Sequence, residues 1–210
     1  MRVRPVSTEV LVDELVDLLT CRKVDSHLRV AVDGAPAAGP GELADALVGP
    51  LRARGRPALR IDTGDFLRPA SVRLEFGRHD PDSYYQGWFD EAGLAREVLD
   101  PAGPGGSGRV LTKLWNPATD RAAREPYADL AAGAILLVSG PLLLGGGLAF
   151  DVTVHLEMSA AALARRTPPE DAWTLPAFGR YAEEVGPASF ADVVVRVDDP
   201  RRPAMVLERS

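Results

Sequence analysis

Apolar residues at helical spacing predict a helix near the start of the chain, over residues 8–22. The residues that carry this spacing are Val10, Leu11, Leu15, Leu18 and Leu19. Ser7 or Thr8 can cap the helix, and Glu9 complements the positive end of its dipole. We expect residues 1–27 to form an N-terminal helical extension that packs against the rest of the domain.

Five short apolar runs predict the strands of a sheet. They cover residues 28–33, 57–62, 134–138, 152–156 and 193–197. Runs that are apolar at nearly every position are typical of parallel strands buried under helices on both faces. Most of the stretches between them are helical in pattern, and residues 42–54 alternate Leu and Ala as a helix does. The pattern therefore predicts a three-layer α/β fold with a mainly parallel sheet.

The remaining segments are less regular. Residues 66–87 are polar and aromatic, residues 94–99 have a helical pattern, and residues 109–115 predict a strand in a hairpin. Residues 165–176 are rich in charge and proline, which predicts a mobile loop that closes over a site as a lid. A short helix is expected after it, over residues 177–184.

Length and composition indicate one domain over residues 1–210. Hydrophobic residues make up 46% of the chain, which suffices for a core that needs no staples. The only cysteine, Cys21, cannot form an internal disulfide, and no apolar run is long enough to cross a bilayer. We therefore expect a cytoplasmic protein. The net charge of -6 argues against a nucleic-acid partner, because binding to the phosphate backbone relies on clustered positive charge.

A glycine-rich loop follows the first of these strands and precedes the helix over residues 42–54. Its two outer glycines have the spacing of a phosphate-binding P-loop, GxxxxGK[ST], in the strand–loop–helix context that this motif requires. The predicted phosphate loop consists of Gly34, Ala35, Pro36, Ala37, Ala38, Gly39, Pro40 and Gly41.

The loop lacks the side chains that bind phosphate and magnesium in a working P-loop. Pro40 stands where the lysine bridges the phosphates, and Gly41 where a hydroxyl holds Mg²⁺. Pro40 also has no N–H group to donate, although proline is well suited to the first position of a helix. The carboxylate of Glu42 would repel an incoming phosphate. We expect these changes to preserve the helix and to weaken the site.

The order of segments resembles the uridine kinase group of P-loop nucleoside kinases over residues 28–206. The matching segments are VAVDGAPAAGPGELA, IDTGDFLRPASVR, DPDSYYQGWFD, DPAGPGG, ILLVSGPLLL and RYAEEVGPASFADVVVRVDDPRRP. The resemblance implies the P-loop kinase fold and an ancestor that moved the γ-phosphoryl group of a nucleoside triphosphate to a hydroxyl of a nucleoside or related alcohol.

The resemblance transfers poorly to the positions that do chemistry. The family's general base is an aspartate two positions before the phenylalanine, and that position is Gly64 here. Asp65 is one position off, and we take it as the candidate catalytic residue. The acidic residue expected near the metal after the ILLV strand is Ser139, so we predict no metal site. Lys113, one of two lysines in the chain, is the remaining candidate for a compensating ammonium group.

The acceptor side and the lid keep more of the family pattern. Eight side chains in these segments are the predicted ligand-binding residues: Arg68, Arg73, His79, Tyr84, Tyr85, Arg165, Arg166 and Arg180. For each one the alternative is structural, because arginines on an acidic protein usually pair with carboxylates and paired tyrosines usually pack. The histidines are scattered and form no zinc-ligand spacing. His155 lies in the apolar run VTVHLEM, which predicts a hydrogen-bonded core residue.

Three functions remain open on these residues. One is a kinase-derived protein without kinase activity that binds a nucleoside, nucleotide or related metabolite. Another is an enzyme that uses the acceptor pocket for different chemistry, with Asp65, His79 or Tyr85 as acid or base. The third is an active kinase that uses ATP and Mg²⁺ as cofactors with help from Lys113 or the lid arginines. The expected partner is a nucleoside- or nucleotide-like small molecule, with a second copy of the chain as an option; nucleic acid and membranes are not expected.

Geometry distinguishes these functions. An active kinase predicts an open anion pocket over residues 34–41 and an acidic side chain near the metal position. An enzyme with new chemistry predicts a closed phosphate side and polar groups that converge near Asp65. A binding protein predicts a filled cleft or a large apolar patch.

Overall fold

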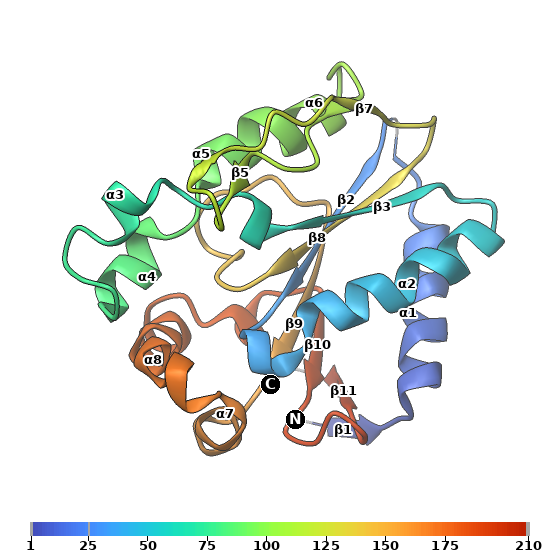
Figure 1. The fold of residues 1–210 in the computed structure, drawn as a ribbon. Helices are drawn as coiled ribbons and strands as arrows, with labels where there is room; N and C mark the ends of the chain where they lie inside the picture. Colours follow the sequence, from blue (N-terminus) through green and yellow to red (C-terminus); the bar gives the residue numbers. More distant parts are fainter. Residues whose placement is uncertain (1, 25, 209–210) are drawn as a thin grey trace.

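A seven-stranded sheet forms the centre of the molecule in the computed structural model, which describes residues 2–24 and 26–208 (Figure 1). Its strands are β1 (Arg2–Pro5), β2 (Leu28–Asp33), β3 (Ala58–Asp62), β8 (Ile135–Gly140), β9 (Val152–Glu157), β10 (Val193–Arg196) and β11 (Ala204–Glu208). They lie in the order β1-β11-β10-β9-β2-β8-β3. All five strands predicted from apolar runs are present.

Five of the strands, β10, β9, β2, β8 and β3, are parallel, as predicted. β2 pairs with both β8 and β9, so the chain passes β8 on its way from β2 to β3 and passes β2 on its way from β8 to β9. The strand order therefore reverses direction at β2. In open parallel sheets, ligands bind beyond the carboxyl ends of the strands at such a reversal, and the glycine-rich loop lies at that point.

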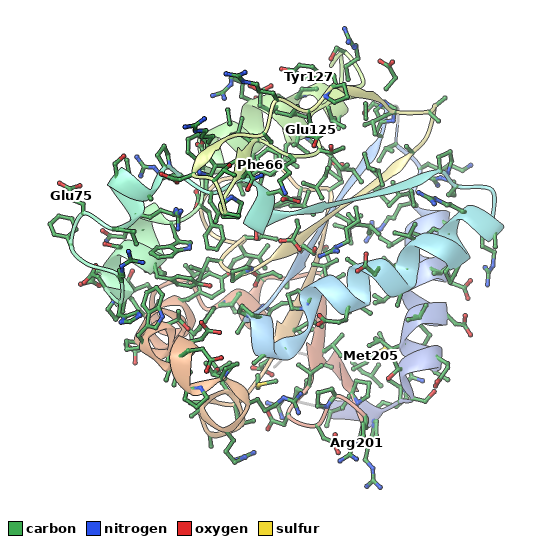
Figure 2. All side chains as sticks on the ribbon, viewed as in Figure 1. Phe66, Glu75, Glu125, Tyr127, Arg201 and Met205 are labelled. Atoms are coloured by element: carbon green, nitrogen blue, oxygen red, sulfur yellow. The ribbon has the colours of Figure 1, made fainter. Side chains whose placement is uncertain are left out.

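Helices cover both faces of the sheet and give the predicted three layers (Figure 1). On one face, α1 (Thr8–Cys21) and α2 (Pro40–Ala53) pack against alternate residues of the strands, such as Val30, Val32 and Leu137. The opposite face packs against one continuous helical stretch. It comprises α5 (Glu91–Leu94), a wider turn over Ala95–Leu99, and α6 (Asp100–Ala102). Phe66, labelled in Figure 2, is fully buried in this second core.

A third group of helices lies at the carboxyl end of the strands. It contains α3 (Ala70–Arg73), α4 (Pro81–Gly87), α7 (Ala160–Arg166) and α8 (Leu175–Glu184). α4 contacts α8, and α7 contacts the short turn at Pro36–Ala38 that precedes α2. Side chains of α4, α7 and α8 form a buried cluster against which Ala35 and Ala37 of the glycine-rich loop pack.

The N-terminal extension begins with a strand in addition to the predicted helix. β1 pairs antiparallel with β11, which in turn pairs antiparallel with β10, so the two chain ends together extend one edge of the sheet. The prediction missed both strands because β1 has only four residues and ends in proline, a pattern too short to show alternation. Ser7 is the residue that caps α1, accepting a hydrogen bond from the N–H of Val10.

Two further predictions are corrected. Residues 109–115 are not one strand: β4 (Arg109–Val110) pairs with β7 (Ala128–Asp129), and β5 (Trp115–Asn116) pairs with β6 (Arg121–Ala122). Residues 165–176 are not a loop, because α7 continues to Arg166, a 3₁₀ helix covers Pro169–Thr174, and α8 begins at Leu175. Proline at a first helical position favours these short helices, whereas the same prolines were interpreted from the sequence as loop residues.

Two more 3₁₀ turns, Thr63–Asp65 and Pro187–Ser189, follow β3 and α8. No helix within residues 2–24 and 26–208 has the length and apolar character needed to span a membrane.

Candidate functional site

The glycine-rich loop has the shape of a P-loop entrance to α2. The N–H of Gly34 donates a hydrogen bond to the carbonyl of Gly140 at 3.2 Å, which ties the start of the loop to β8. Gly39 has φ 78° and caps α2 in the left-handed conformation that favours glycine. Pro40 is the first residue of α2, as the sequence predicts, so the helix forms without the N–H that proline lacks.

Arg60 of β3 fills the space beside Gly41. A Cβ atom at Gly41 would lie 2.7 Å from Nη2 of Arg60, which is closer than real Cβ contacts allow. Gly41 stands where a working P-loop carries the hydroxyl that binds Mg²⁺. The guanidinium group therefore lies where that hydroxyl would begin, and glycine is the residue that leaves room for it.

Three side chains hold this guanidinium in place. Its Nε donates to the hydroxyl of Ser139 at 3.0 Å, and Nη1 donates to both carboxylate oxygens of Asp45 at 3.0 and 3.2 Å. Nη2 donates to Asp62, whose other oxygen accepts from the N–H of Gly64 at 2.8 Å. Residues two apart on a strand share a face, and Asp62 pairs in register with Ser139, so β3 and β8 bring these groups together beneath α2.

Arg60, Asp45 and Asp62 were not among the site residues predicted from the sequence. Arg60 lies inside the strand PALRID, where one charged residue at an alternating position is typical of an exposed face. The available signal was the pair Arg60 and Asp62 on the same face as the buried Ala58, since a charged pair aimed at a covering helix needs a partner there.

Glu42 and Arg166 lie at the mouth of the loop. The carboxylate of Glu42 stands over Gly39, 3.3 Å from where a Cβ atom would be. Nε of Arg166, at the end of α7, donates to the carbonyl of Ala37 at 3.4 Å. The loop therefore carries a negative group on its helix side and a positive group on the α7 side.

A cavity of about 420 Å³ opens beside this loop, between it and the chain ends. Pro36–Gly39, Glu42 and Arg166 form its polar and loop side, and Leu43, Val197 and Pro203 contribute apolar walls. Its size falls in the range of small-molecule sites, and so does its mainly apolar lining with a few polar groups.

Asp65, the predicted catalytic residue, forms an ion pair with Lys113 at 2.8 Å. The hydrogen bond that Lys113 donates to this carboxylate raises the pKa of Lys113, so its ammonium group stays charged at neutral pH. The backbone repeats the link, because the N–H of Leu114 donates to the carbonyl of Asp65. Lys113 is thus engaged with Asp65 on the acceptor side.

Arg68 and Arg73 lie near each other, and Arg68 borders a cavity. Nε of Arg73 donates to the carbonyl of Arg68 at 2.6 Å, and its guanidinium lies over the ring of Trp88, 5.0 Å from the ring centroid. The residue is 8% exposed, so it packs inside the α3–α4 corner. Arg68 lines a shallow hollow of about 500 Å³ with Asp82.

The tyrosines and His79 make contacts within the third group of helices. Tyr84 is buried, and burial raises the pKa of its hydroxyl well above its ordinary value. Its ring packs on those of Trp88, Phe89, Trp173 and Phe178, at centroid distances of 5.5–5.8 Å. His79 stacks on Trp173 at 5.5 Å.

Tyr85 and Arg180 join α4 to α8. The guanidinium of Arg180 lies 4.5 Å from the ring centroid of Tyr85 and pairs with Asp82 and Glu184. The hydroxyl of Tyr85 donates to Glu184 at 3.1 Å. Arg165 and Arg166 lie exposed at the end of α7, and Arg166 borders the cavity beside the P-loop.

The predicted site residues therefore occupy three places instead of one. The phosphate loop and Arg166 meet at the 420 Å³ cavity. Asp65 lies with Lys113, most of the other residues form contacts among α3, α4 and α8, and Arg165 lies exposed next to Arg166 on α7. Over residues 2–24 and 26–208, no group of three or more His, Cys, Asp or Glu side chains is arranged to hold a metal ion.

Comparison with known proteins finds similarity in structure alone. No family model and no curated protein matches the sequence. A possible uridine kinase from Bacillus stearothermophilus aligns with a TM-score of 0.72 and 20% identity, covering 89% of this chain and 97% of that protein. A candidate fructose transport system kinase from Silicibacter sp. TM1040 aligns with a TM-score of 0.53 and 20% identity, covering 82% of this chain and 95% of that one.

A third solved structure, of the YGR205w protein, aligns with a TM-score of 0.56 and 12% identity, covering 96% of this chain and 98% of that protein. Together these structures confirm the predicted fold, an α/β P-loop kinase fold like that of uridine kinase-like proteins.

Proposed function

We propose that this protein binds a nucleoside, nucleotide or related small metabolite and is not a competent Mg²⁺- and ATP-dependent kinase. The observation that carries this proposal is the guanidinium of Arg60 beside Gly41, at the start of α2. Phosphoryl transfer depends on positioning and on neutralising charge by a lysine, a hydroxyl-bound Mg²⁺ and the loop N–H groups. Pro40 and Gly41 remove the first two of these and one of the N–H donors.

The residues around Gly41 do not fit a magnesium ion. A hard divalent cation needs oxygen ligands, and the acids that stand nearest, Asp45 and Asp62, already pair with Arg60. A cation placed there would lie against the guanidinium and be repelled by it. For this reason no catalytic step is assigned to Mg²⁺ or ATP in this protein.

The cavity beside the P-loop is the proposed ligand site. Its apolar walls, including Leu43 and Val197, suit the flat face of a base, and Glu42 can accept hydrogen bonds from amino or hydroxyl groups. Arg166 supplies the positive charge that a phosphate group needs at the same mouth. This combination favours a nucleoside monophosphate or similar metabolite over a triphosphate, because Arg166 is the one cationic side chain among the described residues of the lining.

Calorimetry with a panel of nucleosides and nucleoside monophosphates tests the proposal. We expect binding of at least one panel member, and a loss of about tenfold in affinity for a monophosphate in Arg166→Ala, since hydrogen bonds to charged groups contribute about 1.5–3 kcal/mol. Arg165→Ala is the matched control, because it removes the neighbouring exposed arginine outside the cavity lining and should leave affinity unchanged. Equal losses in both variants, or no binding by any panel member, would contradict the proposed site.

The pair Asp65–Lys113 supports a second candidate, an enzyme with different chemistry on the acceptor side. Both side chains are about one third exposed and lie 2.8 Å apart, so a ligand can reach a carboxylate and an ammonium group together. This candidate predicts turnover of a bound ligand that Asp65→Asn abolishes while binding persists. Binding without turnover across the same panel would leave the binding protein as the better account.

A further inference from the structure

A second cavity of about 320 Å³ lies on the other side of the glycine-rich loop. It is bounded by the end of β9, by α7 and α8, and by the turn Pro187–Ser189. Most of its lining is apolar, from Leu156, Met158, Leu163, Phe178, Ala182 and Pro187. His155 also lines this cavity, and its side chain is 10% exposed.

A buried hydrogen-bond network stands behind His155. Asp33, at the end of β2, is fully buried, and its Oδ2 is 2.7 Å from Nδ1 of His155 and accepts a hydrogen bond from the hydroxyl of Tyr181 at 3.0 Å. Its Oδ1 accepts from the N–H of Leu143 at 2.9 Å, and the N–H of Leu144 donates to the hydroxyl of Tyr181 at 3.0 Å. The sequence prediction of a hydrogen-bonded core histidine is confirmed.

This network determines which nitrogen of His155 carries the proton. A carboxylate only accepts hydrogen bonds, so Nδ1 is the donor to Asp33 and, in the neutral ring, Nε2 is an acceptor. Burial raises the pKa of Tyr181, and the nearby charge of Asp33 raises it further, so its hydroxyl keeps the proton that it donates. Both oxygens of Asp33 and the hydroxyl of Tyr181 therefore have hydrogen-bond partners. Nε2 of His155 has no hydrogen-bond partner among the described residues.

A purely structural network would not need this arrangement. The N–H of Leu143 and the hydroxyl of Tyr181 already donate one hydrogen bond to each oxygen of Asp33, and the Tyr181 bond joins α8 to β2. The histidine adds a ring whose orientation Asp33 fixes and whose second nitrogen remains available at a mainly apolar cavity. Apolar walls with one fixed polar group are the usual composition of a small-molecule site.

We propose that His155 anchors a second binding site, which takes an uncharged, mainly apolar molecule bearing a hydroxyl group. Nε2 accepts the hydrogen bond from that hydroxyl, and the apolar walls bury the rest of the molecule. The described residues of the lining include no arginine or lysine, and the nearby Asp33 is acidic, so an anionic ligand is disfavoured. This site is independent of the ligand proposed for the cavity beside the P-loop.

The test uses 2-naphthol and 2-methoxynaphthalene as a matched pair of probes, with NMR of the protein labelled with ¹⁵N at histidine. The two probes share the same ring, but only 2-naphthol can donate a hydrogen bond. We expect 2-naphthol to bind about tenfold more tightly, in keeping with one hydrogen bond, and to shift the Nε2 resonance of His155. Equal binding of both probes, or no binding of 2-naphthol, would overturn the proposal.

Two variants make the result specific. His155→Phe keeps an aromatic ring and removes both nitrogens, so it should abolish the preference for 2-naphthol. Ala188→Leu narrows the cavity from its wall without touching the network, and it should weaken both probes while the His155 to Asp33 contact persists. If Ala188→Leu leaves 2-naphthol binding unchanged, the probe lies elsewhere and the proposed site is wrong. Nucleoside binding beside the P-loop should be unaffected in Ala188→Leu, which separates this proposal from the proposed function.

Discussion

At the scale of single residues, the site is defined by Gly41 and Arg60 acting as a pair. The guanidinium of Arg60 occupies the space that the side chain of any larger residue at position 41 would take. Glycine at position 41 leaves that space open for it. Asp45, Asp62 and Ser139 fix the guanidinium from three directions, so it cannot swing away at little cost. The result is a start of α2 with a fixed guanidinium group beside its second residue.

The close approach at Gly41 predicts an unusual response to alanine. Replacing glycine by alanine inside a helix normally stabilises a protein by about 0.5–1 kcal/mol. We expect Gly41→Ala to destabilise by about 1 kcal/mol instead, because the new methyl group displaces Arg60. Gly179→Ala in α8 is the matched control, since a Cβ atom there meets nothing within 4 Å and should give the ordinary gain. Urea unfolding measures both, and a gain at position 41 equal to that at 179 would show that Arg60 moves freely.

The sequence predicted the site's backbone better than its side chains. The loop's position, the missing lysine and hydroxyl, and Pro40 at the first position of α2 all follow from motif spacing and proline geometry. The contacts of Arg60 do not follow, because they join β3, β8 and α2 through residues that lie up to 79 positions apart in the chain. Local patterns carry no information about such long-range pairs.

At the scale of elements, residues 165–176 belong to a set of helices held by aromatic packing. Trp173, in the 3₁₀ helix Pro169–Thr174, packs against Tyr84 and Trp88 of the α4 region at 5.5 and 5.3 Å, and against His79. The sequence pattern suggested a mobile loop because prolines and charges dominate it. One tryptophan that reaches a neighbouring helix changes that outcome, and its partners are remote in sequence.

Removing Trp173 should make residues 168–176 less stably folded. We expect Trp173→Ala to destabilise the protein by about 2–3 kcal/mol, from lost apolar burial and aromatic contacts. Hydrogen exchange should rise first in residues 168–176 and in α4. Phe76→Ala is the control, because Phe76 is 76% exposed and its loss should change neither stability nor exchange. If hydrogen exchange in residues 168–176 is unchanged in Trp173→Ala, this segment is held by its backbone contacts alone.

The secondary-structure prediction likewise succeeded where an element has a strong pattern of its own and failed where distant partners stabilise it. Strands buried on both faces were predicted well because their apolar runs are continuous, as in β2 and β8. The strands β1 and β11, at one side of the sheet, were missed, since each gains its stability from pairing with neighbouring strands and not from its own pattern. The helical stretch over residues 91–102 begins three residues before the predicted one, at the cap supplied by Asp90.

At the scale of the whole molecule, the two ends of the sheet differ in structure. The cavities lie at the carboxyl ends of the strands, whereas the opposite end is joined by Arg29 and Asp151. Asp151 accepts from the N–H, Nε and Nη2 groups of Arg29 at 2.8–3.0 Å. A change at this end should therefore alter stability without altering the sites.

The Asp151 carboxyl gives the fold a defined pH dependence. Burial raises the pKa of Asp151, but its hydrogen bonds and charge contact with Arg29 outweigh burial, so the net pKa lies below its ordinary value. A lowered carboxyl pKa stabilises the fold above the unfolded pKa, about 3.9, and this stabilisation is lost as the pH falls through the folded pKa. We expect Asp151→Asn to cost about 2 kcal/mol at pH 7 and progressively less below about pH 4.

Urea unfolding between pH 3 and pH 7 measures this difference. Asp13→Asn, at an exposed position of α1, is the control and should show no such narrowing. A constant difference between wild type and Asp151→Asn across that range would mean that the Arg29 pair does not depend on the carboxylate charge. Binding beside the P-loop should be the same in wild type and Asp151→Asn at pH 7.

The most direct test of the central proposal is calorimetry of ATP with the wild-type protein, with Mg²⁺ and again with a chelator. If Arg60 occupies the metal position and Pro40 removes the phosphate-binding lysine, ATP binding should be no tighter with Mg²⁺ than without it. Any residual affinity should then depend on Arg166. Micromolar binding of ATP that requires Mg²⁺ would contradict the proposal, because it would mean that the loop still assembles a working phosphate and metal site.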